Sequence, residues 1–138
     1  VSEVQQKITD LGIKDTTVKA VDKGISISLE RIQFLADSAI LLDSEKAKLD
    51  MIAQILAEFP DNDLLITGHT ARAGTVESQI ILSKERAASV AEYLLSIGVK
   101  DPYHIFTKGV GSEQPIATNA NEEGKSRNRR VEITILDK

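Results

Sequence analysis

Apolar residues recur along this chain with two spacings, three to four residues in some segments and two in others. The first spacing predicts amphipathic helices, and the second predicts half-buried strands. The helical spacing occurs first at the start of the chain, where an apolar stripe stops at Gly12, a residue type that often ends helices. The stripe comprises Val1, Val4, Ile8 and Leu11. We expect residues 1–15 to form a linker or an N-terminal helix, and residues 16–138 to form the main domain.

The strand spacing follows directly. Residues 17–21 and 25–29 alternate between apolar and polar types on either side of Gly24, which suits a hairpin turn because glycine accepts positive φ. The second arm of this hairpin is expected to continue through Ile32 and Phe34.

Two longer helices are expected after the hairpin. The first begins at a cap formed by Asp43 or Ser44 and ends at Pro60, with apolar residues along one face. Those residues are Leu49, Ile52, Ala53, Leu56 and Phe59. The second begins at Thr75 and is closed by Gly98. Its core stripe comprises Ile80, Ala87, Val90, Ala91 and Leu94.

Short extended segments are expected at 64–67, 105–108 and 129–136, and residues 109–128 are expected to be mostly loop. The order of elements is therefore hairpin, helix, strand, helix, loop and strand. This order predicts an α+β fold in which the helices pack on one face of a mixed sheet.

Composition limits the functions that this fold can carry. A chain of 138 residues with 41% hydrophobic content suits one domain with a buried core. Its net charge of −4 gives no general attraction to nucleic acid or acidic membranes. No apolar run approaches the roughly 20 residues that cross a bilayer, so we expect any export signal or membrane anchor to lie outside these residues. The lack of cysteine excludes thiol catalysis and disulfides.

The sequence predicts no catalytic and no metal-binding pattern. The two histidines, His69 and His104, do not have the spacing of metal ligands. The chain has no G-x-S-x-G nucleophile motif and no assignable carboxylate pair. We therefore expect no catalytic residue, no metal ligand and no cofactor.

One side of the second long helix carries candidate binding chemistry. Gln79, Leu82 and Arg86 are three and four residues apart, which places them on a narrow stripe beside the core stripe. The segment 68–71 leaves a strand and turns towards this helix. Arg86 would supply a cation suited to bidentate pairing with a carboxylate. The alternative is that Arg86 is an exposed helix arginine paired with a neighbouring glutamate.

Several separated motifs resemble those of the OmpA-like C-terminal domain, and they occur in the same order over Gly24 to Asp137. They are Phe34-Leu35-Ala36-Asp37-Ser38, Thr67-Gly68-His69-Thr70, Leu82-Ser83-Lys84-Glu85-Arg86-Ala87, Gly109-Val110-Gly111 with Gln114-Pro115, and Asn128-Arg129-Arg130-Val131-Glu132. The resemblance implies an OmpA-like βαβαβ sandwich that binds the stem peptide of peptidoglycan without a covalent bond and is not an enzyme. It also implies a periplasmic location, with attachment to the outer membrane or cell wall through regions outside this chain.

The resemblance also assigns a ligand site. In this family a loop aspartate and a helix arginine hold the two ends of a diamino acid, typically diaminopimelate. Arg86 matches that arginine, whereas Ala71 stands where the aspartate is usual and Gln79 stands where an asparagine is usual. One of Arg129 and Arg130 is expected to face the pocket and the other solvent, because strand residues alternate. The implied ligand-binding residues are Asp37, Thr70, Ala71, Gln79, Leu82, Arg86, Arg129 and Arg130.

The alanine leaves two functions open. In the first, the domain binds peptidoglycan through an altered or weakened site, and the stem peptide that it recognises can be of a type other than diaminopimelate. In the second, the domain has lost this ligand and serves as a structural domain or binds another envelope protein.

Overall fold

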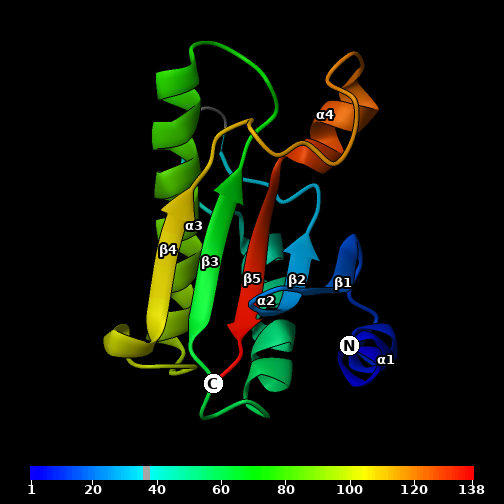
Figure 1. Ribbon diagram of the computed structural model, residues 1–138, viewed down its shortest axis with the longest axis vertical. Helices are drawn as coiled ribbons and strands as arrows, with labels where there is room; N and C mark the ends of the chain where they lie inside the picture. The colour runs from blue at the N-terminus through cyan, green and yellow to red at the C-terminus, as the bar shows by residue number, and fades with distance from the viewer. Residues whose placement is uncertain (36–37) are drawn as a thin grey trace.

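The computed structural model describes residues 1–35 and 38–138, and its central element is one five-stranded mixed sheet (Figure 1). The strands lie in the order β1 (Thr16–Val21), β2 (Gly24–Leu29), β5 (Arg130–Leu136), β3 (Leu64–His69) and β4 (Ile105–Gly109). Neighbouring strands are antiparallel except β3 and β4, which are parallel. The predicted hairpin and the later strands are confirmed, and β3 continues beyond the expected end as far as His69.

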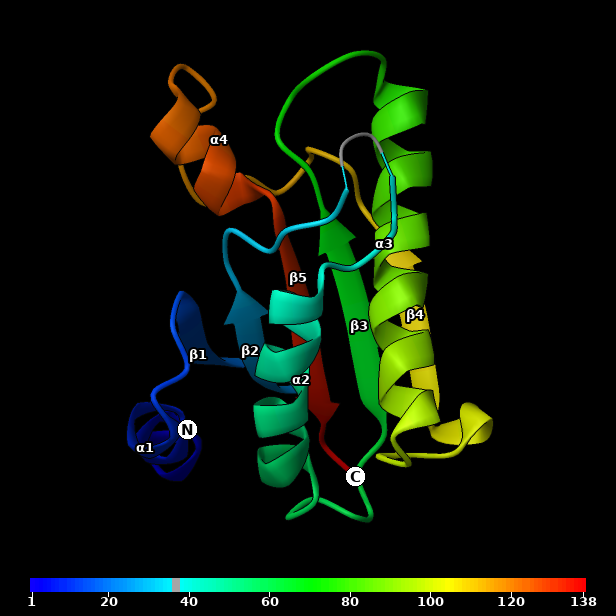
Figure 2. The same ribbon diagram turned by 180° about the vertical axis from the view of Figure 1, so that it is seen from behind.

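Two helices, α2 (Asp43–Leu56) and α3 (Val76–Ser96), cover one face of the sheet, which confirms the predicted layering (Figure 2). The N-terminal helix α1 (Ser2–Leu11) contacts β1 and α2 and ends at Gly12, where φ is 68°. A 3₁₀ turn, η1 (Pro102–His104), precedes β4. A short helix, α4 (Glu122–Asn128), leads into β5 near the end of the sheet where β3 finishes (Figure 1).

The core lies between the sheet and the helices. Leu56 of α2 and Leu94 of α3 are 1% and 0% exposed, so these predicted core positions are buried. Helix α2 ends at Leu56, before the predicted end at Pro60, so Phe59 follows the helix and is half-buried. Val4 and Ile8 of α1 belong to the same core cluster. Burial of a leucine side chain stabilises a fold by about 1.5–3 kcal/mol. None of the described helices is both long enough and apolar enough to cross a membrane.

Helix ends differ partly from the sequence prediction. Thr75 caps α3 as expected, since its hydroxyl accepts a 3.0 Å hydrogen bond from the backbone N–H of Ser78. The prediction that Asp43 or Ser44 caps α2 is wrong. The N-cap residue is Leu42, and no side chain caps this end. Asp43 instead occupies the first turn, where its negative charge suits the helix dipole.

One further expectation is wrong, and another is incomplete. The second hairpin arm does not continue through Ile32, because the chain turns at Arg31, where φ is 57°, and Phe34 forms only an isolated bridge with Leu41. Residues 109–128 are mostly loop, as expected, but they also contain α4. This helix is only seven residues long, and polar contacts stabilise it more than an apolar stripe does: Asn121 caps it by accepting a 2.8 Å hydrogen bond from Gly124.

Candidate functional site

The residues that the sequence placed on one stripe of α3 line a common pocket. Gln79, Leu82 and Arg86 form one wall, and Thr70 and Ala71, which follow β3, form another. The pocket has a volume of about 690 Å³. Arg129 lines it as well, so the structure brings together six of the eight implied ligand-binding residues, which come from segments separated along the chain.

A close backbone contact explains why the end of β3 lies beside this part of α3. A Cβ atom at Gly68 would lie 2.0 Å from the backbone oxygen of Ser83, so only glycine allows this approach. The Ser83 hydroxyl accepts a 3.0 Å hydrogen bond from the N–H of Gly111, and the Gly111 carbonyl accepts one of 2.9 Å from the N–H of Thr70. These contacts hold the segment after β3 against the helix.

The segment after β2 orients Arg86. Its Nε donates a 2.9 Å hydrogen bond to the carbonyl of Ser38, and its guanidinium carbon lies 4.7 Å from the centre of the Phe34 ring. A guanidinium over an aromatic face gains both electrostatic and packing energy. Arg86 is half-buried, which argues against the alternative that it is a solvent-exposed helix arginine. Asp37, which was also assigned to this site, lies outside the described residues.

Helix α4 contributes the third wall. Lys125 and Arg129 line the pocket together with Arg86. Arg129 donates a 2.8 Å hydrogen bond to Glu122, but both side chains are exposed, and such surface pairs contribute little stability. None of the lining residues that the structure describes is acidic. The described wall of this pocket thus carries three cationic side chains, of which Arg129 is paired with Glu122.

Arg130 lies elsewhere. It is 3% exposed, and it donates hydrogen bonds of 2.9 Å to Glu132 and 2.8 Å to the carbonyl of Gln114. It is not among the residues that line the pocket, so Arg129 is the arginine of the pair that faces it. The expectation that the other arginine faces solvent is wrong. Strand β5 begins at Arg130, which places this side chain on the same face as Glu132, two residues on.

His69, Glu132 and Arg130 form a largely buried group of titratable side chains. His69 directly precedes Thr70, which lines the pocket. His69 Nε2 is 3.2 Å from Glu132, whose other oxygen accepts from Arg130. Burial lowers the pKa of His69, so its imidazole is neutral. Burial opposes ionisation of Glu132, but its contacts with His69 and Arg130 outweigh this effect and lower its pKa to about 2. Glu132 therefore holds the charge of Arg130 in the interior.

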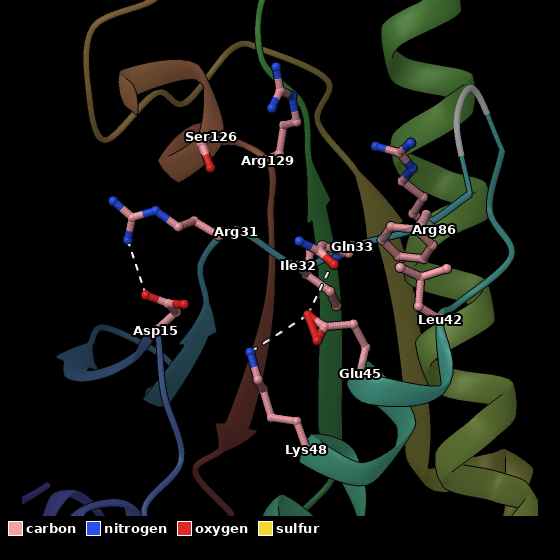
Figure 3. Close-up of a pocket in the computed structure, with 11 residues that line it drawn as sticks. Asp15, Arg31, Ile32, Gln33, Leu42, Glu45, Lys48, Arg86, Ser126 and Arg129 are labelled. Atoms are coloured by element: carbon pink, nitrogen blue, oxygen red, sulfur yellow. Dashed lines mark hydrogen bonds and ion pairs between the residues drawn. The ribbon is translucent and has the colours of Figure 1, made fainter. Parts of the chain in front are cut away.

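A second hollow of about 540 Å³ adjoins the first, because Arg86 and Arg129 line both (Figure 3). Its base includes Glu45, which is buried, accepts a 3.2 Å hydrogen bond from the N–H of Gln33 and lies 3.6 Å from Lys48. Arg31 and Asp15 form a second ion pair at 3.1 Å, so four of the six charged residues that line this hollow are paired with one another.

Comparison with known proteins identifies the family. The model described as the OmpA family matches residues 33–129. The chain belongs to the OmpA family. The match includes the end of β3, all of α3 and the whole of α4, and so covers every described wall of the pocket.

Relatives of this OmpA-family domain have names that refer to the cell envelope. The peptidoglycan-binding protein ArfA of Mycobacterium tuberculosis is 42% identical over 104 residues, which are 75% of this chain and 32% of ArfA. The probable lipoprotein YiaD of Escherichia coli is 36% identical over 126 residues, which are 89% of this chain and 57% of YiaD. The chain thus spans less than two thirds of the length of these curated relatives.

A solved structure supports the same fold over the whole chain. The cell wall anchor of the T6SS from Pseudomonas aeruginosa is 29% identical and superposes with a TM-score of 0.81. The superposition covers 98% of this chain and 97% of the other. The OmpA-like arrangement of helices and sheet therefore accounts for nearly all of this domain.

Sequence reasoning missed four residues that line the pocket of this OmpA-family domain, namely Ala73, Gly74, Ser78 and Lys125. Lys125 was missed because α4 was not predicted. The signal was present in Asn121 followed by Glu122 and Glu123, a cap and an acidic first turn, with Lys125 and Arg127 in the last turn. Within the described residues, no group of three or more potential ligand side chains is arranged to hold a metal.

Proposed function

We propose that this domain binds the stem peptide of peptidoglycan without a covalent bond and thereby anchors an envelope protein to the cell wall. The observation that carries the proposal is the position of Arg86 in a pocket with Thr70, Gln79 and Leu82. A guanidinium held by neighbouring contacts can pair bidentately with a carboxylate of the peptide. The named functions of ArfA and of the T6SS anchor support the same class of ligand.

Two unsatisfied polar atoms add support. The Thr70 hydroxyl and the Gln79 amide oxygen are buried, and neither has a hydrogen-bond partner within the described part of the chain. Both residues line the pocket. Buried polar groups nearly always find a partner, so a bound peptide or an ordered water would complete these two.

The ligand site is altered relative to the usual family pattern. Ala71 is 6% exposed and lines the pocket where the resemblance implies an aspartate. Loss of one partner of a buried charge pair costs about 2–5 kcal/mol in interfaces of known energetics. We therefore expect weaker binding to diaminopimelate, or preference for a stem peptide that does not depend on this carboxylate.

The domain is proposed to act in the periplasm as a binding module rather than as an enzyme. The probable lipoprotein YiaD and the peptidoglycan-binding protein ArfA are larger than this chain, which suits a module that is attached to other segments. Attachment to the outer membrane or cell wall would then be provided by regions outside this chain.

A second candidate function follows from Ala71. If the missing carboxylate abolishes ligand binding, the fold serves as a structural domain or as a binding domain for another envelope protein. The cationic side chains that line the pocket, Arg86, Lys125 and Arg129, would then contact a partner protein.

Sedimentation with peptidoglycan sacculi from the protein's own source separates the two candidates. The parent domain is expected to pellet with sacculi, and Arg86→Ala is expected to stay largely in the supernatant. Lys84→Ala is the matched control, because Lys84 lies on the same helix, is exposed and does not line the pocket. No pelleting of the parent, or equal pelleting of Arg86→Ala and Lys84→Ala, would favour the second candidate.

A further inference from the structure

Helix α4 presents opposite sides to the pocket and to the β1–β2 hairpin. Lys125 and Arg129 line the pocket, and the N–H of Arg129 donates to the carbonyl of Lys125, so the helical spacing extends to both. Glu123 and Arg127 each precede one of these residues by two positions, which is about 200° around a helix. They therefore lie on the side of α4 that faces away from the pocket.

Glu30, which directly follows β2, joins the hairpin to this second side of α4. It is 7% exposed, and both oxygens of its carboxylate accept hydrogen bonds. Arg127 Nε donates one of 3.0 Å, and the Thr17 hydroxyl donates one of 3.1 Å. The backbone N–H of Glu30 donates a 2.8 Å hydrogen bond to the carbonyl of Asp15. Because hydrogen bonds between charged groups are stronger than neutral ones, Glu30 is a firm anchor for α4.

Arg31 adds a second link to the same side of α4. Its guanidinium lies 3.1 Å from Asp15 (Figure 3) and 3.7 Å from Glu123. Glu123 belongs to the first turn of α4, and Arg127 belongs to its last turn. The end of the hairpin therefore contacts both turns of this short helix. Exposed pairs such as Arg31–Glu123 contribute little stability, so Glu30 is the stronger of the two links.

These contacts place one wall of the pocket under the control of the hairpin. The hairpin residues that hold α4 precede the segment 33–129, which the OmpA-family model matches. Arg129 pairs with Glu122 of the same helix, so this pair moves with α4. A displacement of α4 would shift the pair and Lys125 together relative to Arg86, which belongs to α3.

We propose that Glu30 is a positioning residue for the ligand pocket. Through Arg127 it holds α4 against the hairpin, and it thereby sets the positions of Lys125 and Arg129 relative to Arg86. Glu30 is not among the residues that line the pocket, so it affects the affinity without touching the ligand. The inference rests on the proposed function, because it concerns the affinity of the same site.

Sedimentation with peptidoglycan sacculi from the protein's own source, titrated to give an apparent affinity, tests the inference. Glu30→Gln and Arg127→Gln are each expected to weaken binding by about threefold to tenfold, as found for residues that act on a site without touching its ligand. The variant with both changes should bind no worse than the weaker single variant, because the two side chains act as one pair. Glu58→Gln is the matched control: it removes an ion pair with Lys7 of α1, does not line the pocket and should bind as the parent does.

Amide hydrogen exchange separates positioning from a general loss of stability. In α4, the N–H groups of Lys125 and Arg129 donate to the carbonyls of Asn121 and Lys125. Both should exchange faster in Glu30→Gln and in Arg127→Gln than in the parent. The amides of β3, a central strand, should change less, because loosening of α4 is a local event.

The inference is overturned, with the proposed function left standing, if Arg127→Gln binds sacculi as tightly as the parent. It is also overturned if the two single effects multiply in the double variant, or if binding weakens while the exchange of α4 is unchanged. The side chain of Arg127 is 42% exposed, so Arg127→Gln serves as the test if Glu30→Gln fails to fold. No pelleting of the parent would remove the proposed function and this inference with it.

Discussion

Arg86 on α3 and Ala71 after β3 line the same pocket, although fourteen intervening residues separate them in the chain. The guanidinium is oriented by Ser38 and Phe34, so its position does not depend on a carboxylate at residue 71. A family site can therefore lose the aspartate and keep the geometry of its arginine. This relationship makes the effect of restoring the carboxylate predictable.

Ala71→Asp is expected to strengthen binding to the tripeptide L-Ala-γ-D-Glu-meso-diaminopimelate, whose side-chain amine is unmodified. The new carboxylate would supply a partner for the ligand ammonium opposite the Arg86–carboxylate pair, with a gain on the order of 1–3 kcal/mol. Calorimetric titration resolves a change of this size. Arg86→Ala in the same background should remove the gain. Ala47→Asp, at an exposed position on α2, adds the same charge away from the pocket and should bind as the parent does. If Ala71→Asp binds no better than Ala47→Asp, another group carries the recognition.

Gly68→Ala is expected to destabilise the domain by about 1–3 kcal/mol or more, because the added methyl would overlap the backbone oxygen of Ser83. Gly12→Ala provides the comparison, since a Cβ at Gly12 meets no atom within 4 Å and only its left-handed backbone is unfavourable. That strain costs roughly 1–2 kcal/mol. Urea unfolding of both variants would check that Gly68→Ala loses more stability than Gly12→Ala. Equal losses would show that the approach of β3 to α3 relaxes easily.

The main helices and the central strands could be predicted from sequence because their stability comes from buried apolar stripes. Leu56 and Leu94 lie where the helical spacing put them. The stripe that holds Gln79 and Arg86 was also accessible, since spacing along one helix decides which residues share a side. These features depend on local periodicity.

Other features depend on the path of the chain between elements. Helix α4 has no long apolar stripe, so its presence and the direction of Lys125 follow from polar contacts with the preceding loop. The choice between Arg129 and Arg130 was equally inaccessible. Arg129 lies at the junction after α4, and Arg130 begins β5, so strand alternation does not apply to both.

Asn128→Asp is expected to loosen the loop that supports α4. The Asn128 side chain is 0% exposed. Its oxygen accepts from the N–H groups of Ile116 and Ala117, and its nitrogen donates to the Ala117 carbonyl and to Asn119. An aspartate keeps the acceptor and loses the donor, which leaves its second oxygen facing the acceptor oxygens of Ala117 and Asn119. A loss of about 2–4 kcal/mol in urea unfolding is expected.

The same variant should also weaken binding, because Lys125 and Arg129 flank the disturbed residue. Asn62→Ala is the control for stability alone. Its side chain makes a single 2.8 Å hydrogen bond to the Leu136 carbonyl far from the pocket, and its removal should cost about 1 kcal/mol without changing affinity. Unchanged ligand affinity in Asn128→Asp, measured under conditions where it is folded, would show that α4 does not contribute to binding.

The buried group of His69, Glu132 and Arg130 predicts that stability declines in acid. The pKa of Glu132 is about 2 in the folded protein, below its ordinary value, so unfolding takes up a proton as the pH falls. The stabilisation is present above the unfolded pKa, which is near 4.3 for glutamate, and is lost as the pH approaches 2. Its size is on the order of 3 kcal/mol, from about 1.4 kcal/mol per pKa unit.

His69 acts in the same direction. Its lowered pKa keeps it neutral in the folded state, whereas the unfolded chain gains this proton below about pH 6.5. Urea unfolding at pH 7, 5 and 3.5 should therefore give successively lower stability. Glu132→Gln should be less stable at pH 7, because Arg130 loses its charged partner, but its stability should fall less steeply between pH 5 and 3.5. Glu122→Gln changes an exposed carboxylate that pairs with Arg129 on the surface, so it should keep the acid decline of the parent. If Glu132→Gln declines as steeply as the parent, the acid sensitivity arises from other carboxylates.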